Sequence, residues 1–230
     1  MSEALYEKEI KCPICNNKFK TMKVRKNACI VDKKDSDFCT HYKNHNPIFY
    51  EIFVCPFCGY SASESSFEDL TKNEVQRLKE VFSGFRVSRS FCDERNISDA
   101  IDSFKLALYT SKSKEAKDSI IAGTCLKIAW LYRYLGDAKE RTFIEYALEN
   151  YVKAYNVEDF PIGSFDEITM QYIMGELSRR LGKYDDAILW LSKAVSNPER
   201  SKNPRIEKMA REQWALAKEE YKKVKKTETL

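Results

Sequence analysis

Residues 12–15 read Cys-Pro-Ile-Cys, and residues 55–60 read Cys-Pro-Phe-Cys-Gly-Tyr. A gap of two residues lets both sulfurs of one turn point at a common centre, and two such turns complete a tetrahedral shell of four thiolates. Gly59 suits this turn, because the residue after the second cysteine often has a positive φ angle. The spacing therefore predicts one bound metal ion, expected to be zinc, with the ligands Cys12, Cys15, Cys55 and Cys58.

Four protein ligands leave no open position for a substrate or an activated water, so this site is expected to be structural rather than catalytic. Ordinary thiols or a redox pair are the alternative, which the two proline-containing pairs disfavour. Iron is the competing ion, because rubredoxins hold iron in a similar S4 shell and thiolates alone do not separate the two metals. The long intervening segment, residues 16–54, and the helical remainder of the chain favour zinc.

The composition is that of an ordinary soluble globular protein. The chain has 230 residues, of which 43% are apolar and 32% are charged, with a formal net charge of +4. Residues 1–10 lack the basic start and apolar run of a secretory signal. No apolar run approaches the roughly 20 residues that span a bilayer. We therefore expect a cytoplasmic protein without membrane contact, in which paired cysteines serve as metal ligands rather than disulfides.

Residues 1–64 are predicted to form a small zinc-ribbon-like β module. Residues 19–25 alternate apolar and polar side chains, which is typical of a half-buried strand. Residues 48–54 form a β-branched and aromatic run, predicted to be a second strand. Residues 33–47 are rich in Asp, Asn, Lys and Ser and are predicted to be a loop. The module has too little core to be stable alone, so metal binding is expected to supply much of its folding free energy.

Residues 65–224 are predicted to be helical. Thr71 and Glu74 fit a capping box at the start of the first helix, and residues 65–68 offer a competing start. Residues 204–223 resemble a final capping helix, and residues 225–230 are expected to be a flexible tail.

A small–large–small pattern recurs three times within the helical part. Each copy has alanines seven residues apart with a large apolar residue between them, a spacing that resembles the second helix of a tetratricopeptide-type hairpin. The copies are Ala100/Phe104/Ala107, Ala147/Tyr151/Ala154 and Ala187/Leu191/Ala194. In the third copy Gly175 falls at the expected helix crossing and Gly182 in the expected turn. The copies are unevenly spaced, so the predicted array of antiparallel hairpins is irregular; an ordinary helical bundle is the alternative.

A second candidate metal cluster is formed by Cys29, Cys39, His41 and His45, which include both histidines of the chain. Their spacing fits no known metal knuckle, and ordering a flexible loop costs conformational entropy. We therefore favour a polar loop with packed thiols over a second ion. Cys92 and Cys125 are expected to be small buried hydrophobic residues in or beside helices.

No catalytic site is predicted. The seven glycines form no phosphate-binding loop, no cofactor-binding motif is present, and both histidines lie in the loop beside the proposed metal site. The remaining carboxylates lie in charged helix faces, which are typical of solvated surface. The sequence therefore favours a protein that is not an enzyme.

Several runs together resemble a known family: residues 6–15, 18–25, 35–42, 46–50 and 54–60. They resemble domain of unknown function 2225, an uncharacterised bacterial family, over nearly the whole chain and most strongly over residues 6–60. The resemblance implies a bacterial protein with a metal ribbon and helical repeats, and it implies no reaction. Asp37, Pro47 and Tyr50 match this family's motif and are interpreted as loop-shaping residues.

The predicted fold is thus mainly α, with an N-terminal zinc-ribbon-like domain followed by a tetratricopeptide-like array. The leading functional hypothesis is a zinc-binding adaptor without catalytic activity that binds a protein or peptide through its repeats. The alternatives are RNA or DNA binding through the basic residues 18–26, and rubredoxin-like electron transfer through bound iron. Residues 1–60 carry ten basic and seven acidic side chains, a weak excess for a nucleic-acid protein.

Overall fold

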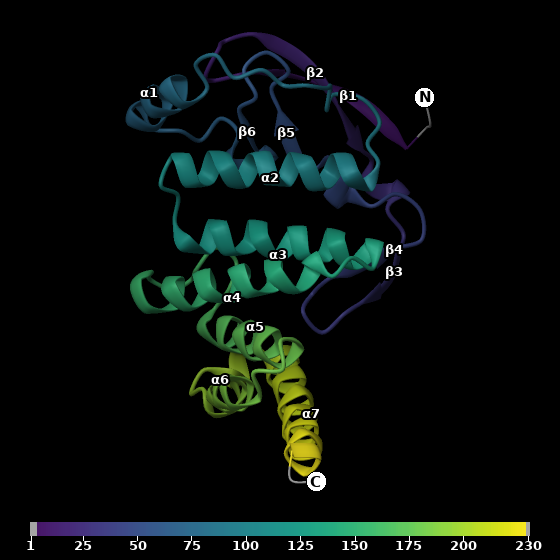
Figure 1. Cartoon of the computed structure of the whole chain (residues 1–230), viewed down its shortest axis with the longest axis vertical. Helices are drawn as coiled ribbons and strands as arrows, with labels where there is room; N and C mark the ends of the chain where they lie inside the picture. Colours follow the sequence, from purple (N-terminus) through teal and green to yellow (C-terminus); the bar gives the residue numbers. More distant parts are fainter. Residues whose placement is uncertain (1–3, 229–230) are drawn as a thin grey trace. The chain divides into compact units, whose positions relative to one another are not determined.

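The computed structural model describes residues 4–228 and is mainly helical, with short antiparallel strand pairs towards the N-terminus (Figure 1). This confirms the predicted fold class. The described strands are β1 (Leu5–Lys11), β2 (Lys18–Val24), β3 (Val31–Lys34), β4 (Thr40–Tyr42), β5 (Ile52–Val54) and β6 (Ser61–Ser63). The described helices are α1 (Lys72–Val81), α2 (Ile97–Ser113), α3 (Asp118–Leu135), α4 (Lys139–Val157), α5 (Glu167–Arg180), α6 (Tyr184–Ser196) and α7 (Pro204–Glu228). Four 3-10 turns accompany them: η1 (Lys26–Ala28), η2 (Pro47–Tyr50), η3 (Glu64–Ser66) and η4 (Arg200–Lys202).

The strands form three two-stranded antiparallel sheets, β1–β2, β3–β4 and β5–β6. The predicted strand over residues 19–25 is confirmed as β2, which pairs with β1 from Leu5 opposite Val24 to Lys11 opposite Lys18. Phe19 and Thr21 are buried in β2 at a spacing of two, as the alternation of side chains across a strand requires. Val24, three residues after Thr21, is buried in a separate cluster with Leu5 and Tyr50.

Two expectations for the segment between the cysteine pairs were wrong. Residues 33–47 are not a plain loop, because they contain part of the β3–β4 hairpin, in which Lys34 lies opposite Thr40. Residues 48–50 are not strand but part of η2. Pro47 presets the backbone for this turn, and the Asn46 side chain accepts a hydrogen bond from the Ile48 amide.

The chain divides into two compact units. The first unit runs from the N-terminal strands to Asp35 and includes Cys39–Ala116 and Lys127–Glu140. The second unit comprises Ser36–Phe38, Lys117–Leu126 and the chain from Arg141 onward. The predicted domain boundary at residue 64 falls between the last described strand, β6, and the first described α-helix, α1. The two compact units do not divide at this residue, so the domain boundary stays a prediction.

The first unit has a core built around the cysteine pairs. Its buried members are Ile10, Cys12, Ile14, Phe19, Phe53, Cys55, Tyr60, Phe67, Leu78 and Phe82. The last two come from α1 and the turn that follows it, so α1 packs on the strands that carry the cysteines. The predicted capping box is confirmed: the Thr71 side chain accepts from the Glu74 amide, and the Glu74 carboxylate accepts from the Thr71 amide.

Arg95 is a buried charge in the first unit that the sequence did not single out. Its guanidinium donates to the backbone carbonyls of Phe91, Phe49 and Ile52 at 2.7, 3.2 and 2.7 Å. Its backbone amide donates to the Tyr50 hydroxyl at 3.2 Å. Burial lowers the pKa of Arg95 to about 10, which leaves the side chain charged at neutral pH. Arg95 therefore joins η2 and β5 to the segment that precedes α2.

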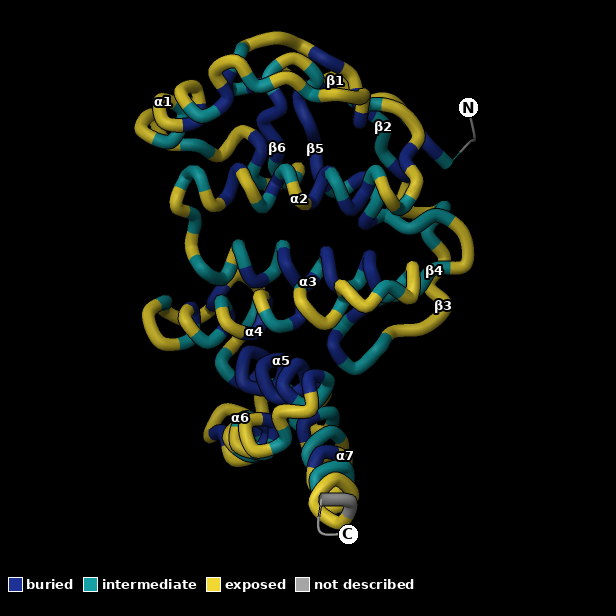
Figure 2. Tube along the Cα trace, in the orientation of Figure 1, coloured by how far each residue is buried: buried dark blue, intermediate teal, exposed yellow. Residues whose placement is uncertain are grey.

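The repeated small–large–small positions are all buried. The first copy lies in α2, the second in α4 and the third in α6, and none of their residues is more than 4% exposed. In the second unit α5 is buried along most of its length, from Ile168 to Ser178 (Figure 2). A Cβ atom built on Gly175 of α5 lies 2.5 Å from Leu191 Cγ of α6, so the expected close crossing is confirmed. Gly182, between the two helices, has a φ angle of +75°, as the turn requires.

The segment Ser36–Phe38 groups with the second unit. The Tyr172 hydroxyl donates to the Ser36 carbonyl at 2.6 Å, and the Phe38 ring lies 5.5 Å from the Tyr172 ring. Asp37 is completely buried, with an ion pair to Arg180 at 3.5 Å. The loop-shaping interpretation of Asp37 thus omitted its ion pair with Arg180, a partly buried residue of α5.

The last helix is longer than expected. α7 starts at Pro204 as predicted but continues to Glu228, so residues 225–228 are helical rather than part of a flexible tail. Lysines near a helix C-terminus interact favourably with its dipole, and Lys225 and Lys226 lie in the last turn. Residues 229 and 230 lie outside the described part of the chain. Among the described residues, no helix combines the length and apolar character needed to cross a bilayer.

The α5–α6 crossing gives the first testable prediction. We expect Gly175→Ala to destabilise the second unit by about 1–3 kcal/mol, because the new methyl group overpacks against Leu191. Gly123→Ala in α3 is the matched control, since its nearest contact would be the Tyr151 hydroxyl at an ordinary 3.8 Å. Alanine is the better helix former, so this control should gain about 0.5–1 kcal/mol. Denaturant unfolding measures both, and equal stability of the two variants would contradict the close crossing.

Candidate metal centre

The two cysteine turns have the same backbone geometry. In the first turn the Asn16 amide donates to the Cys12 carbonyl, and in the second the Gly59 amide donates to the Cys55 carbonyl, both at 2.9 Å. A second bond closes each turn from the other side, from the Cys12 amide to Asn17 and from the Cys55 amide to Tyr60, again at 2.9 Å. Two copies of one knuckle therefore face each other.

The residue after the second cysteine has a positive φ angle in both turns. Gly59 has φ +80°, which confirms the prediction made for it, and Asn16 has φ +60°. Asparagine tolerates this left-handed region better than most residues. Alignment of the two Cys-Pro-x-Cys motifs would have predicted the same conformation at Asn16.

The four sulfurs converge on one centre. All four Sγ atoms lie within 4.8 Å of one another, and the Cys12–Cys58 and Cys15–Cys55 pairs are each 3.6 Å apart. All four cysteines are free thiols, and a disulfide would require a sulfur–sulfur distance of about 2.05 Å. A tetrahedral zinc ion with Zn–S bonds of about 2.3 Å places its sulfurs about 3.8 Å apart. The donor set and its spacing therefore fit one tetrahedral ion.

Without a cation, negative charges on these closely spaced sulfurs would repel one another. Hydrogen bonds from Cys12 and Cys58 lower the pKa of the Cys55 thiol well below its usual range, so a negative charge forms readily within the cluster. The hydrogen bond to Cys55 raises the pKa of Cys12 to about 12, and the contacts with Cys12 and Cys55 raise the pKa of Cys58. Four thiolates can coexist here only when a cation neutralises them, which is what a bound metal supplies.

The protein matrix around the cluster is apolar. Cys12 and Cys55 are completely buried, and Phe53 and Tyr60 belong to the same core. The Asn17 side chain donates to Cys15 Sγ at 3.5 Å. Such donors reduce the charge density on the sulfur and orient the ligand.

The second candidate cluster is assembled only in part. The structure brings Cys39 and His41 together with Asp35, a residue that the sequence analysis did not include, with ligand atoms within 4.8 Å of one another. Among the described residues, Cys29 and His45 belong to no such group. The Cys29 thiol instead donates to the Arg25 carbonyl at 3.5 Å.

Protein partners already occupy the Asp35 carboxylate. Its Oδ2 atom lies 2.8 Å from His41 Nε2 and 2.9 Å from a guanidinium nitrogen of Arg133. Although partial burial raises the pKa of Asp35, these two contacts outweigh it, and the net shift is downward. A cationic guanidinium beside the site opposes a second cation there, so the arrangement agrees with a packed polar loop better than with a second ion.

The other two cysteines belong to neither candidate metal cluster, although Cys92 packs against the core that contains Cys12 and Cys55. Cys125 is buried in α3, as expected. Cys92 is half-buried in the irregular segment before α2 rather than in a helix, and its carbonyl accepts from the Met22 amide of β2 at 2.8 Å.

Metal removal tests the cysteine cluster. We expect one zinc ion per chain by elemental analysis with native mass spectrometry. Chelation, or Cys12→Ser with Cys55→Ser, should unfold the strands of the first unit, because structural zinc contributes about 10–16 kcal/mol of binding free energy in small zinc domains. Circular dichroism and amide hydrogen exchange measure this loss of folded structure in the first unit.

Cys39→Ser with His41→Ala is the matched control for metal content. This variant should retain one ion per chain, because its side chains lie outside the four-sulfur cluster. Two ions in the parent and one in this variant would instead assign a second ion to Asp35, Cys39 and His41.

The backbone of the second knuckle gives a further prediction. Gly59→Ala should destabilise the first unit, because alanine is strained at φ +80° and its Cβ atom would lie 2.3 Å from the Phe85 ring. Gly84→Ala is the matched control, with φ +79° and nothing within 4 Å of the new atom. Gly59→Ala should therefore lose at least about 1 kcal/mol more than Gly84→Ala. Thermal unfolding of the two zinc-loaded variants measures this difference in stability. Equal melting temperatures would contradict the predicted clash and strain at Gly59.

Comparison with known proteins agrees with the resemblance seen in the sequence. The sequence model of one family, described as "Uncharacterized protein conserved in bacteria (DUF2225)", matches residues 5–217. No curated protein and no solved structure matches the chain. The match spans both cysteine knuckles and most of α7. The chain therefore belongs to the uncharacterised bacterial family DUF2225.

Proposed function

We propose that the chain is a cytoplasmic zinc-stabilised adaptor that binds a protein partner through its helical hairpins and catalyses no reaction of its own. The proposal has two parts. The zinc ion has a structural role in the first unit, and the helices of the second unit present the binding surface.

The structural role of the ion follows from its ligand count. Four cysteines complete a tetrahedral shell, so no coordination position remains for a substrate. The ligands are anchored by two backbone knuckles and enclosed by the aromatic core. We favour zinc over iron because the four-cysteine shell is closed and its neighbours are apolar core side chains. Such a site suits a redox-inactive ion with a structural role.

The helical hairpins support the adaptor role by analogy with repeat proteins. Each repeated helix buries its two alanines and the large residue between them, and the α5–α6 pair crosses closely at Gly175. Tetratricopeptide-like arrays use this packing and leave a continuous outer surface for partners.

The observation that carries the proposal is an exposed apolar cluster in the second unit. We call it the aromatic patch; it comprises the contacting rings of Tyr155, Phe160 and Trp190, of which Tyr155 and Trp190 are partly exposed, together with the exposed Val157 two residues after Tyr155 on α4. The Tyr155 ring lies 5.6 Å from Phe160 and 5.1 Å from Trp190. Val157 is 75% exposed and Phe160 38% exposed. Clustered exposed aromatic residues mark protein interaction sites.

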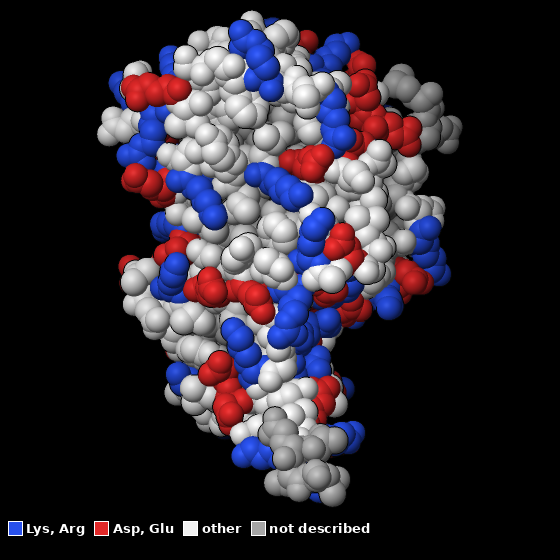
Figure 3. Space-filling view, in the orientation of Figure 1, with Lys and Arg blue, Asp and Glu red and all other residues white. Residues whose placement is uncertain are grey.

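Nucleic-acid binding through residues 18–26 is less well supported. Lys18 pairs with Glu9 and Lys20 with Glu7, and Lys23 pairs with Glu64. Acidic neighbours therefore neutralise most of the basic strand. On the face shown in Figure 3, basic and acidic side chains are interspersed rather than gathered into one basic surface, whereas nucleic-acid proteins carry a basic stripe.

Quantitative co-purification tests the adaptor role. The tagged, zinc-loaded full chain is cross-linked in a bacterial host, and partners are quantified by mass spectrometry. We expect a stoichiometric protein partner whose recovery falls at least tenfold in Val157→Ser/Phe160→Ser, because apolar anchors dominate interface affinity.

Ile120→Ser is the matched control, since Ile120 is another exposed apolar residue of the second unit, 46% exposed and outside the patch. It should retain the partner. Recovery that is equal in both variants, or no stoichiometric partner with the parent chain, would contradict the proposal.

A further inference from the structure

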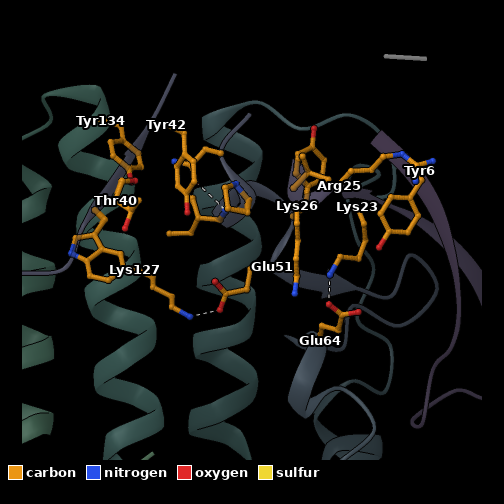
Figure 4. Close-up of a pocket in the computed structure, with 16 residues that line it drawn as sticks. Tyr6, Lys23, Arg25, Lys26, Thr40, Tyr42, Glu51, Glu64, Lys127 and Tyr134 are labelled. Carbon is orange, nitrogen blue, oxygen red and sulfur yellow. Dashed lines mark hydrogen bonds and ion pairs between the residues drawn. The ribbon is translucent and has the colours of Figure 1, made fainter. Parts of the chain in front are cut away.

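A half-open cavity of about 370 Å³ lies in the first unit, between α2 and residues 85–91 of the segment that joins α1 to α2. A larger cavity of the same unit, of about 640 Å³, has walls from β1, β2, β4, η2 and the C-terminal half of α3 (Figure 4). In the larger cavity Lys127 pairs with Glu51, and Lys23 pairs with Glu64. None of the four cysteines of the metal centre lines either cavity. The smaller cavity nevertheless adjoins the metal centre through its wall.

Residues 85–91 form this wall and are anchored on the second cysteine knuckle. A Cβ atom built on Gly59 would lie 2.3 Å from the Phe85 ring and 3.3 Å from Val87 Cγ2, so both side chains pack directly against the knuckle. Phe91 is only 5% exposed, and the buried Arg95 guanidinium donates to its carbonyl at 2.7 Å. Side chains fixed in this way lose little conformational entropy when a partner binds.

The interior of the smaller cavity is apolar. Phe85, Val87 and Phe91 line it from the joining segment, and Leu106 lines it from α2. Tyr109, three residues after Leu106 and therefore its neighbour on the helix surface, is 48% exposed. A half-open apolar cavity can accept a large aliphatic or aromatic side chain of a partner, and anchors of this kind dominate the affinity of an interface.

Basic side chains dominate the rim of the same cavity. Arg86, Arg89 and Lys105 line it, against one acid, Asp102. Arg89 is committed to α2, because it pairs with Asp102 and, at 3.3 Å, with Asp99. Lys105 forms only a loose ion pair with Asp102, at 4.0 Å. The rim therefore keeps a surplus of positive charge.

Arg86 is the base that carries this surplus. Its side chain is exposed, and within residues 4–228 its guanidinium makes one hydrogen bond, to the carbonyl of its neighbour Phe85 at 3.1 Å, and no ion pair. The remaining donors of a guanidinium suit a carboxylate, which they can bind through two parallel hydrogen bonds. Charge complementarity therefore favours an acidic partner.

We propose that this cavity is a docking site for an acidic segment of a partner protein. A large apolar side chain of the segment enters the cavity, and carboxylates beside it bind Arg86 and Lys105. An apolar centre within a polar rim is the usual anatomy of a protein interface, and opposite charges steer the partner towards it. The inference adds a second surface to the adaptor role and does not rest on it, because the aromatic patch lies in the second unit and this cavity in the first.

A nucleic-acid strand, which is also an anion, fits this surface less well than an acidic peptide. A strand needs a basic track and exposed rings on which successive bases stack. The Phe91 ring is buried, and the Arg89 guanidinium already lies 5.2 Å from its centre. Asp99 and Asp102 hold Arg89 in turn. The surplus charge is thus local, and the ring beside it is covered.

Peptide selection tests the docking site. A phage-displayed library of random 12-residue peptides is selected on the immobilised, zinc-loaded full chain, and the most enriched peptide is synthesised with a fluorescent label. We expect the enriched sequences to share a Leu, Phe or Trp flanked by Asp or Glu. The labelled peptide should bind with a Kd below about 100 µM in an anisotropy titration, and a single-stranded RNA 12-mer should not displace it.

Charge reversal locates the bound peptide at the rim. Arg86→Glu and Lys105→Glu should each weaken binding at least tenfold, because each places a negative charge where a carboxylate binds. Lys72→Glu is the matched control, since Lys72 is an exposed base at the start of α1, outside the cavity, and the change in net charge is the same. This control should bind the peptide as the parent chain does.

Two further variants separate the cavity interior from the aromatic patch. Leu106→Ser should weaken peptide binding at least tenfold, because it removes part of the apolar interior. Val157→Ser/Phe160→Ser should leave the Kd unchanged, so failure of this site and failure of the adaptor role are distinguishable. Zinc content and circular dichroism confirm that each variant is folded, and Arg86→Ala replaces Arg86→Glu if the reversal prevents folding.

Several outcomes would overturn the proposal. They are a selection without enrichment, enriched sequences that lack acidic residues, and displacement of the peptide by the RNA 12-mer. A Kd that Arg86→Glu and Lys105→Glu leave unchanged, an equal loss in Lys72→Glu, or loss of binding in Val157→Ser/Phe160→Ser would place the peptide elsewhere and overturn it equally.

Discussion

Convergence of four cysteine sulfurs is the constraint on which the first unit depends. The two knuckles that carry them are 39 residues apart in sequence yet repeat the same pair of backbone hydrogen bonds and the same positive φ angle. Each knuckle projects two sulfurs, and the core of β1, β2, β5 and α1 packs directly around them. Because thiolates repel one another, a cation at their centre would hold the strands together, and the small sheets alone provide too little apolar burial to do so.

Three buried charges, Arg95, Asp37 and Glu176, fix segments beyond the cysteine cluster. Arg95 donates to the carbonyls of Phe49 and Ile52 and so ties the chain before the second knuckle to the segment before α2. In the second unit, Asp37 and Glu176 are completely buried and both pair with Arg180. Removal of one partner of a buried, hydrogen-bonded charge leaves the other uncompensated, which is strongly destabilising. The segment between the knuckles is therefore held by specific polar contacts in addition to the convergence of the four cysteines.

The same segment shows where sequence patterns were insufficient. The run of residues 48–54 has the composition of a strand, but Pro47 and Asn46 favour a 3-10 turn over its first half. Residues 33–47 have the composition of a loop, yet β3 and β4 pair through backbone groups whose side chains are polar. Local composition indicates only the preference of the side chains. The η2 turn was decided by capping of its backbone, and the β3–β4 hairpin by pairing between two strands.

The sequence by itself determined the four cysteines that meet as a candidate metal site, the positive φ at Gly59, the capping box at Thr71 and the buried face of each repeated helix. These features follow from short-range spacing and from the conformational preferences of single residues, which a linear sequence displays directly. Only the tertiary structure brought Asp35 to Cys39 and His41, paired Asp37 with Arg180 and assembled the cavity from β1, β2, β4, η2 and α3. Those groups are far apart in sequence or carry no periodic pattern, so their meeting depends on how the chain folds back on itself.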